Sequence, residues 1–365
     1  MIGYMKFVEL GEEEFREFEQ KNPYGNLYQM AERARLREKM GWTTKIFGVR
    51  EGRRLKVAGL VLARDGMAMV PMGPVVDWDK DELERVDYWV RKVIEWAKSE
   101  KMVTLEIFPP VKQSVRDVKG NIEEQYERQA IFEIFARNNF EYMGATTEIE
   151  NKANRWVTVK DLAKFKSVDE MRASYKKNVR NKLRKCSPEI EIVEVRDEAG
   201  LKEVARAIEG SNEKNGMRSR AIGYYKWILE EWGEQVHFVL ARRKEDGETV
   251  AGRVIFDHPN ETVSFISGTV QKYRKMNAMT VLQDDLLTKC FEKGIRRVNF
   301  YGLAGDFSEA NKLLEFKSGF GVKVEEYIGG FRIVLRPVEH KIRRAKGGAM
   351  RAMRGVKNKL MGARK

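Results

Sequence analysis

The chain has 365 residues, a formal net charge of +14 and an apolar share of 42%. This length is sufficient for two domains with separate cores, and the composition excludes a disordered chain, a collagen and a disulfide scaffold. No apolar run approaches the roughly 20 residues that cross a bilayer, and the acidic, mixed segment 1–12 does not have the pattern of a signal peptide. Because the two cysteines, Cys186 and Cys290, lie far apart, we expect reduced thiols in a cytoplasmic protein.

The positive charge is concentrated in two runs. Residues 340–365 carry ten Lys or Arg and no acidic residue, and residues 172–185 carry seven and no acidic residue. Such clusters favour phosphate-rich partners, either nucleic acid or an anionic membrane face. For each run alone, a solvated helix face or a disordered tail explains the charge as well as a phosphate-rich partner does. The three histidines (His237, His258 and His340) are scattered, so we predict no metal site.

The first half of the chain alternates between strand and helix patterns. The periodicity of its apolar residues, together with glycine and proline turn signals, separates the elements. The turn Pro-Met-Gly-Pro-Val at 71–75 is the clearest of these signals. The predicted elements are a helix at 27–40, strands at 44–50, 56–63 and 68–70, a helix at 81–98, a strand at 103–108, a helix at 122–138 and a strand at 140–149.

The second half repeats this order. Lys-Val-Ala-Gly-Leu-Val-Leu at 56–62 reappears as Thr-Val-Ala-Gly-Arg-Val-Ile at 249–255, which indicates two copies of one unit. The predicted elements are strands at 236–242 and 249–255, a helix at 276–293 and a strand at 297–301. Strands mixed with long helices favour an α/β fold with mixed sheets, and this order looks like two tandem N-acetyltransferase-type (GNAT-like) domains. In that fold, acyl transfer happens where the central strands splay.

Helices are also predicted between the halves and at the C-terminus. The basic run lies on a helix at 171–185, and further helices are expected at 201–212 and 224–231. The tail at 342–361 has an apolar stripe with Lys and Arg elsewhere, a pattern typical of a helix that lies on an anionic membrane surface. Four glycines within residues 347–362 weaken it as an isolated helix.

The most distinctive stretch is Asn-Phe-Tyr-Gly-Leu-Ala-Gly-Asp at 299–306, followed by Leu-Glu-Phe-Lys-Ser-Gly-Phe-Gly at 314–321. It predicts a strand, a glycine-rich loop, a short helix, and a lysine between aromatic residues and glycines. Glycine permits close approach of the backbone to a ligand, and the lysine can place its charge on an anion or a developing oxyanion. On pattern alone, a surface lysine in an ordinary strand–loop–helix connection is the simpler explanation.

Several motifs together resemble the FemABX peptidyltransferases, which add amino acids from aminoacyl-tRNA to the stem peptide of peptidoglycan precursors. The resemblance covers nearly the whole chain, and only a short segment separates the helix at 224–231 from the next strand. The chain therefore resembles the compact type of this family, without the long helical arm of its staphylococcal members. The matching motifs are Leu-Tyr-Gln (27–29) with Gly-Trp (41–42), the turn at 71–75, the basic segment 180–185, the stretches at 299–307 and 316–321, and the strand Tyr-Ile-Gly-Gly-Phe (327–331).

The resemblance implies a division of the chain into a first GNAT-like domain at 1–153 and a second at 154–325. Residues 326–337 return as a strand to the first domain, and 338–365 form a basic amphipathic tail. The implied partners are aminoacyl-tRNA and a UDP-linked or lipid-linked muramyl pentapeptide, with no cofactor. We expect a monomer in the cytoplasm that contacts the inner membrane face through its tail.

The resemblance places the transfer chemistry at Lys317 and its neighbour Phe316. An aminoacyl ester is already activated, so positioning and a cation for the oxyanion suffice without a metal or a covalent intermediate. Lys317 is the candidate for that cation, and holding the 3′ end of tRNA by charge is the alternative. The base is open between Glu106, Asp306 and the substrate itself as the proton acceptor. Phe108 replaces the acidic residue that the family has before the proline at the end of the strand at 103–108.

The resemblance also implies where the two substrates bind. Arg220 and Tyr224 match a pair that contacts the diphosphate and uridine, and Arg37 or Lys39 matches a basic phosphate contact on the first helix. The planar fork of arginine suits a diphosphate, although a surface ion pair also explains Arg37. Phe265 falls near a family tyrosine. The residues assigned to substrate binding are Arg37, Lys39, Arg220, Tyr224, Phe265, Tyr301 and Glu106. The residues assigned to tRNA binding are Arg180, Lys182, Arg184 and Lys185.

Two other functions fit parts of the sequence. A CoA-dependent N-acyltransferase has the same fold, but residues 273–278 lack the glycines that cradle a pyrophosphate at a helix start. A non-enzymatic RNA-binding protein accounts for the basic runs and leaves the Lys317 motif unexplained.

Overall fold

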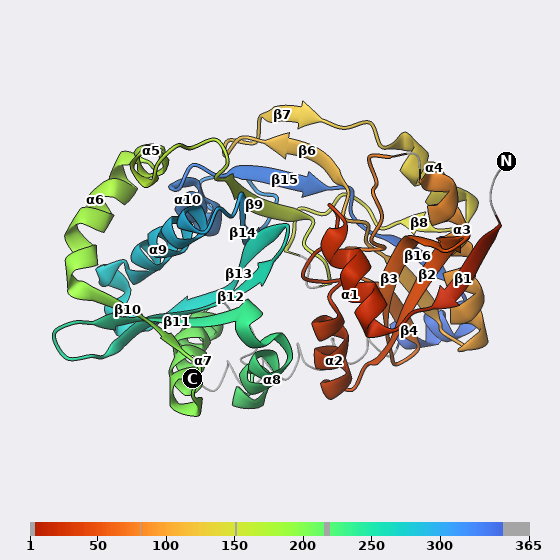
Figure 1. The fold of residues 1–365 in the computed structure, drawn as a ribbon, viewed down its shortest axis with the longest axis horizontal. Helices are drawn as coiled ribbons and strands as arrows, with labels where there is room; N and C mark the ends of the chain where they lie inside the picture. The colour runs from red at the N-terminus through yellow and green to blue at the C-terminus, as the bar shows by residue number, and fades with distance from the viewer. Residues whose placement is uncertain (1–3, 81, 150–151, 215–219, 346–365) are drawn as a thin grey trace.

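The computed structural model describes residues 4–80, 82–149, 152–214 and 220–345, which form two mixed sheets with helices on their faces (Figure 1). None of the described helices is both long enough and apolar enough to span a bilayer. Residues 337–345 of the predicted tail are helical, and the rest of its apolar stripe lies outside the described residues.

The first sheet has seven strands, and helices cover both of its faces. In spatial order the strands are β1 (Met5–Glu9), β2 (Thr43–Glu51), β3 (Arg54–Arg64), β4 (Met67–Val70), β5 (Thr104–Ile107), β16 (Phe331–Val334) and β8 (Glu141–Tyr142). The helices are α1 (Glu12–Lys21), α2 (Ala31–Lys39), α3 (Leu83–Ser99) and α4 (Gln129–Arg137).

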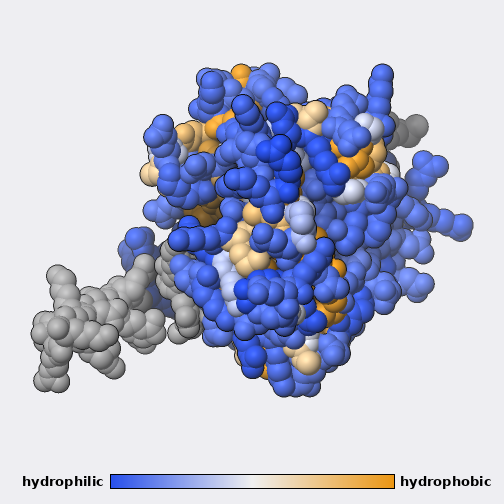
Figure 2. Space-filling model, turned by 90° about the vertical axis from the view of Figure 1, so that its left-hand side faces the viewer, coloured by the Kyte–Doolittle hydropathy of each residue, from blue (hydrophilic) through white to orange (hydrophobic). Residues whose placement is uncertain are grey.

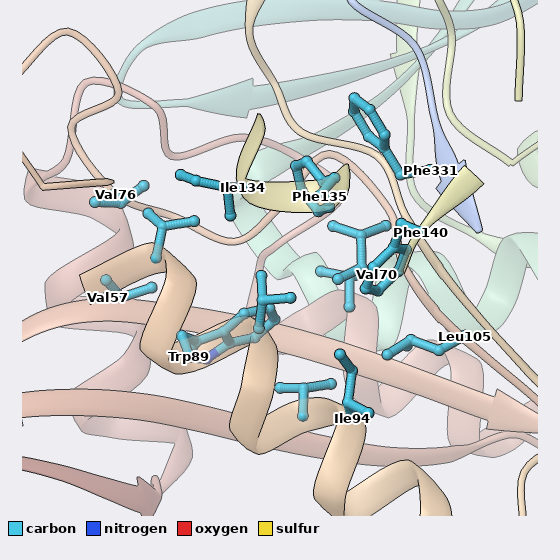
Figure 3. Packing of buried hydrophobic residues seen from close by; sticks show 14 of the residues in the cluster. Val57, Val70, Val76, Trp89, Ile94, Leu105, Ile134, Phe135, Phe140 and Phe331 are labelled. Atoms are coloured by element: carbon cyan, nitrogen blue, oxygen red, sulfur yellow. The ribbon is translucent and has the colours of Figure 1, made fainter. Parts of the chain in front are cut away.

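The core of this sheet shows how a C-terminal strand becomes part of the N-terminal unit (Figure 3). The amphipathic face of α3 buries Trp89, whose indole donates to the carbonyl of Phe47 at 2.9 Å. Phe331 of β16 stacks on Phe135 of α4 with their ring centroids 4.1 Å apart. Aromatic burial of this kind contributes a few kcal/mol per ring, so β16 is held by packing as well as by its ladder.

The second sheet has nine strands. In spatial order they are β10 (Ile190–Val195), β11 (Val236–Arg243), β12 (Thr249–His258), β13 (Glu261–Thr269), β14 (Arg297–Gly302), β9 (Trp156–Asp161), β15 (Lys323–Tyr327), β6 (Lys112–Arg116) and β7 (Ile122–Gln125). The accompanying helices are α5 (Val168–Ala173), α6 (Lys177–Cys186), α7 (Glu198–Lys214), α8 (Ile222–Trp232), α9 (Ala278–Glu292) and α10 (Lys312–Ser318), with 3-10 turns at Ser187–Glu189, Gly233–Gln235 and Gln271–Met276.

The two units exchange strands. β6 and β7 precede residue 153 but pair in the second sheet, whereas β16 follows β15 and pairs in the first. Residues 328–330, which were predicted within a strand, are instead the crossing between β15 and β16. The expected division of the chain at residue 153 stays a prediction.

Some of the predicted elements are wrong in extent. The single helix predicted over 122–138 is divided, because Ile122–Gln125 form an edge strand that pairs with β6. The single helix over 171–185 is interrupted where the backbone N–H of Lys176 donates to the carbonyl of Gly319 at 2.9 Å. The strand over 140–149 is limited to β8.

The helix predicted from 27 begins only at Ala31. The side chain of Gln29 is fully buried, where it accepts from the backbone N–H of Leu60 and donates to the carbonyl of Pro71, both at 2.7 Å. A Cβ on Gly73 would lie 2.6 Å from that amide, so the glycine of the 71–75 turn is required for this approach. The two motifs thus form one packing unit that fixes the neighbouring Tyr28.

The central parallel strands of the second sheet diverge after a short contact. β13 and β14 pair only at Thr262 with Val298 and at Val263 with Asn299. The ladder from β14 to β9 then shifts register between Asn299 and Gly302, and Tyr301 adopts a left-handed φ of 65°. Such a conformation is uncommon for a residue other than glycine and occurs often at functional sites, so Tyr301 is a candidate site residue.

Candidate functional site

Three arginines from both halves of the chain converge beside α2. Arg33 and Arg37 lie one helical turn apart on the same face of α2, and Arg220 lies just before α8. We call these three residues the arginine cluster. Within the described ranges no carboxylate pairs with any of the three, and the Nε atoms of Arg33 and Arg37 are buried without a hydrogen-bond partner.

The charges of the arginine cluster act on one another. Burial, followed by the nearby charges of Arg33 and Arg220, lowers the pKa of Arg37 to about 9. Arg33 is buried, Arg37 is half-buried and Arg220 is exposed. Holding like charges together without an acid, two of them shielded from solvent, is unfavourable, and proteins retain it mainly where a ligand supplies the opposite charge. The cluster is therefore suited to an anion, and the number of arginines suits a multiply charged one.

Aromatic side chains frame the cluster. The guanidinium carbon of Arg220 lies 4.1 Å from the ring centroid of Tyr224 and 5.8 Å from that of Phe265. Arg33 lies 5.4 Å from the ring centroid of Tyr28. These contacts orient the guanidinium planes, as cation–π pairs do, without neutralising them.

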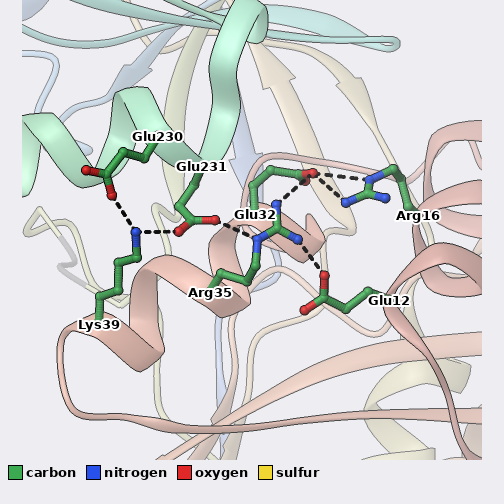
Figure 4. A network of polar contacts seen from close by, with 7 residues as sticks. All are labelled: Glu12, Arg16, Glu32, Arg35, Lys39, Glu230 and Glu231. Carbon is green, nitrogen blue, oxygen red and sulfur yellow. Dashed lines mark hydrogen bonds and ion pairs between the residues drawn. The ribbon is translucent and has the colours of Figure 1, made fainter.

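The opposite face of α2 is neutralised by acids (Figure 4). Lys39 donates to Glu230 at 2.6 Å and forms an ion pair with Glu231 at 2.7 Å. Arg35 donates to Glu231 at 2.6 Å and also pairs with Glu12. Of the two basic residues predicted for the phosphate contact, Lys39 is therefore occupied by carboxylates and Arg37 is not.

A cavity of about 360 Å³ lies where the two sheets meet. Tyr28 and Tyr301 form part of its wall, with ring centroids 6.4 Å apart and hydroxyl oxygens 2.7 Å apart. Its other walls include Arg297, which donates to Glu325 at 2.7 and 2.8 Å and to Glu261 at 2.7 Å. Because Arg33 contacts the ring of Tyr28, the cavity and the arginine cluster share the tyrosine pair as a boundary.

Lys317 is buried behind the end of β14. Its Nζ donates to the carbonyls of Tyr301 and Gly302, both at 2.9 Å, and burial lowers its pKa to about 7. Phe316 packs on Phe320 with ring centroids 5.5 Å apart. The lysine thus holds the backbone of the residue whose side chain lines the cavity.

A second buried lysine flanks the same motif. Lys160 of β9 donates from Nζ to the carbonyl of Phe320 at 2.6 Å and to the hydroxyl of Ser174 at 2.8 Å. Burial, followed by the charge of Lys164, lowers the pKa of Lys160 to about 7. Lys160 therefore fixes the turn after α10 in the way that Lys317 fixes the end of β14.

A model of the FemAB family matches residues 10–245 and 242–346 of the chain. The chain belongs to the FemAB family. The aminoacyltransferase FemB of Staphylococcus epidermidis is 23% identical over 92% of this chain and 96% of its own length. The aminoacyltransferase FemA of Staphylococcus aureus (strain MRSA252) is 21% identical over 98% of this chain and its own full length. The family predicted from the motifs is thus confirmed.

Solved structures show the same fold. FemX matches with a TM-score of 0.77 at 16% identity, covering 92% of this chain and 99% of FemX. A tandem GNAT protein from the clavulanic acid pathway matches with a TM-score of 0.56 at 11% identity, covering 91% and 99%. The predicted tandem GNAT-like fold with mixed sheets is confirmed. The prediction places only a short segment, without a long helical arm, between the helix at 224–231 and the next strand. In agreement with it, only the 3-10 turn Gly233–Gln235 lies between α8 and β11.

The two acids predicted as candidate bases lie apart from the arginine cluster. Glu106 is buried in β5, where it pairs with Lys152 and, at 2.8 Å, with Arg332. Asp306 accepts from the backbone N–H and hydroxyl of Ser308 at 2.9 and 3.0 Å in the loop after β14. Both carboxylates are occupied by local partners.

The predicted tRNA-binding residues form the exposed face of α6. Val179 and Leu183 are buried, whereas the four residues Arg180, Lys182, Arg184 and Lys185 are exposed. α6 contains no acidic residue. The side of the molecule that carries α6 is mostly hydrophilic (Figure 2).

Sequence reasoning missed Arg33 as a member of the arginine cluster. The signal was present, because Arg33 and Arg37 are spaced to share one helix face and Arg35 and Lys39 to share the other. Apart from Glu32, however, the acidic partners that separate the two faces come from α1 and α8 and are not visible from α2 alone.

Proposed function

We propose that this FemAB protein transfers an amino acid from aminoacyl-tRNA to the stem peptide of a peptidoglycan precursor, acting as a monomer. Membership of a family whose named relatives are aminoacyltransferases supports the reaction class. The observation that supports the acceptor is the arginine cluster, which combines residues from both halves of the chain and which no carboxylate pairs with in the part of the chain that the structure describes.

The arginine cluster binds the diphosphate of a UDP-linked or lipid-linked muramyl pentapeptide. Each guanidinium can donate two parallel hydrogen bonds to phosphate oxygens, which a lysine cannot do. Tyr224 and Phe265 offer ring surfaces beside Arg220 for the uridine. Tyr301 lies at the boundary that the arginine cluster shares with the cavity. The stem peptide is placed in this cavity.

Transfer requires the acceptor amine to attack the ester carbonyl carbon. A C–N bond forms, the bond from that carbon to the tRNA 3′ oxygen breaks, and the amine proton leaves for the departing oxygen or for a base. Holding both substrates together supplies much of the rate. Lys317 serves the donor side, where its ammonium holds the tRNA 3′ end or the oxyanion. Two of its three N–H groups are occupied by carbonyls, so the third is the one that meets the ligand.

The donor tRNA lies on α6, whose four exposed cations meet its phosphates. Because charged tRNA is made in the cytoplasm, the reaction belongs there. The basic segment after residue 337 contacts the inner membrane face, where a lipid-linked acceptor resides.

A donor comparison tests this function. The purified protein is incubated with UDP-linked muramyl pentapeptide and either mixed aminoacyl-tRNAs or acetyl-CoA, and the mass of the peptide is measured. We expect an added amino acid with tRNA alone. Acylation from acetyl-CoA alone would instead identify a CoA-dependent acyltransferase, and tRNA binding without acylation would identify an RNA-binding protein.

A further inference from the structure

The anion site depends on the relative position of two helices from different halves of the chain. Arg33 and Arg37 are carried by α2, whereas Arg220 and Tyr224 are at the start of α8. The two helices lie beside one another (Figure 1). A shift of one helix against the other would therefore change the separation of the guanidinium groups.

Two carboxylates on α8, Glu231 and Glu230, connect the helices. Glu231 accepts from the Nε of Arg35 at 2.6 Å and pairs with the Nζ of Lys39 at 2.7 Å (Figure 4). Its side chain is 10% exposed, so solvent weakens these ion pairs less than at an open surface. Glu230, at 59% exposed, pairs with Lys39 alone.

The charge pattern of α2 determines the direction in which these ion pairs pull the helix. Arg35 and Lys39 alternate with Arg33 and Arg37, so attraction to Glu231 pulls one face of α2 toward α8. On the other face, Arg37 and Arg220 repel each other. Removing the Glu231 charge would leave only the exposed pair of Glu230 with Lys39 to oppose this repulsion, and the cluster would widen.

An apolar seam holds the two helices independently of the bridge. Leu27, Met30 and Leu36 pack in one cluster with Tyr225, Ile228 and Trp232. Burial of such side chains from water brings these segments together without the ion pairs. The bridge therefore is not needed to join the helices and acts on their precise alignment.

We propose that Glu231 is a positioning residue that sets the spacing of the arginine cluster for a diphosphate ligand. This inference rests on the proposed function for the identity of that ligand. Glu231 does not touch the ligand and acts through Arg35 and Lys39. Its loss affects the binding of the precursor and leaves the tRNA side of the reaction unchanged.

The test compares two Glu-to-Gln variants of the full chain. Glu231→Gln removes the ion pairs of Arg35 and Lys39 with the less exposed carboxylate of α8 and leaves only the exposed Glu230–Lys39 pair, whereas the control Glu12→Gln removes a partner of the same Arg35 without touching α8. Binding of UDP-linked muramyl pentapeptide is measured by calorimetry without tRNA. We expect Glu231→Gln to weaken binding by roughly tenfold to a hundredfold, the scale of a small misplacement, and Glu12→Gln to leave it unchanged.

Further measurements distinguish positioning from a general loss of structure. The KM for aminoacyl-tRNA should stay at the wild-type value in Glu231→Gln. Arg35→Gln combined with Lys39→Gln should weaken precursor binding by at least the same factor, because it also removes the Glu230–Lys39 pair. Adding Glu231→Gln to that double variant should have no further effect, because the bridge is already absent. If Glu231→Gln does not fold, the Arg35/Lys39 double variant tests the same ion pairs by changing their partners on α2.

Two outcomes overturn different statements. If the wild-type chain binds the precursor and both Glu231→Gln and the Arg35/Lys39 double variant bind it equally well, the positioning role is wrong and the proposed function stands. If the wild-type chain does not bind the UDP-linked precursor, the acceptor assigned to the arginine cluster is wrong, and the role of Glu231 is wrong with it.

Discussion

Arg37 of α2 and Arg220 of the second half lie close enough that the charge of Arg220 contributes to lowering the pKa of Arg37. No carboxylate of the described residues pairs with either guanidinium. Two like charges held together, with Arg37 half-buried and Arg220 exposed, favour the binding of an anion, and that anion would return the pKa of Arg37 toward its usual value.

Replacing Arg33 tests the composition of this site, because sequence reasoning did not include it. Arg33→Gln should weaken binding of the UDP-linked precursor by about 1.5 to 3 kcal/mol, the usual contribution of a hydrogen bond to a charged group. The control is Arg91→Gln on the exposed face of α3, where the arginine pairs with Asp87. Equal affinity of Arg33→Gln and wild type would remove Arg33 from the site.

Lys317→Met should lower kcat strongly while the precursor still binds, since Lys317 is outside the arginine cluster. A loss of about a hundredfold or more is expected if the ammonium meets the developing oxyanion. Lys312→Met on the same helix, whose side chain is 73% exposed, is the matched control. Unchanged turnover in Lys317→Met would exclude Lys317 from the chemistry.

The pH dependence of stability gives a second measurement on Lys317. Its pKa is about 7 in the folded chain and 10.5 when unperturbed, so between these values the unfolded chain binds more protons than the folded chain. The free energy of unfolding therefore gains a component that rises from pH 7 to pH 10 and is flat below pH 7.

Urea unfolding of wild type and Lys317→Met at several pH values isolates this component. Lys160 titrates in the same range in both proteins, so its contribution cancels in the difference. Wild type should gain stability relative to the variant as the pH rises from 7 to 10. A constant difference over that range would show that Lys317 keeps an ordinary pKa.

Substitution of Lys182, Arg184 and Lys185 together by glutamine should weaken tRNA binding and leave the KM for the precursor unchanged. If the three side chains meet phosphates, the slope of log affinity against log salt should fall by about 2 to 3. The control triple variant replaces Lys21, Lys80 and Lys92, which pair with acids elsewhere on the surface. An identical slope in both triple variants would place the tRNA elsewhere.

The order of the main helices and strands could be predicted, because their apolar periodicity is strong. α3, for example, buries Val86, Trp89 and Val93 at helical spacing. β7 could not, because its four residues are all exposed and are held as a strand only by pairing with β6. The exchange of β6, β7 and β16 between sheets depends on contacts that no local pattern records.

The site shows the same limit. The motif around Lys317 identified the family, and Arg37 and Arg220 were predicted from that resemblance. The burial of Lys317 against the carbonyls of Tyr301 and Gly302 was not, because it follows from the left-handed turn at the end of β14. The bridge from Glu231 to Arg35 joins distant segments, and only the folded chain brings them together.

The most direct test of the central claim is the mass of the muramyl pentapeptide after incubation with the protein and aminoacyl-tRNA. The account predicts an increase equal to one or more aminoacyl residues, which disappears when the tRNA is first deacylated or digested with ribonuclease. An unchanged mass with every charged tRNA, on either the UDP-linked or the lipid-linked acceptor, would contradict it.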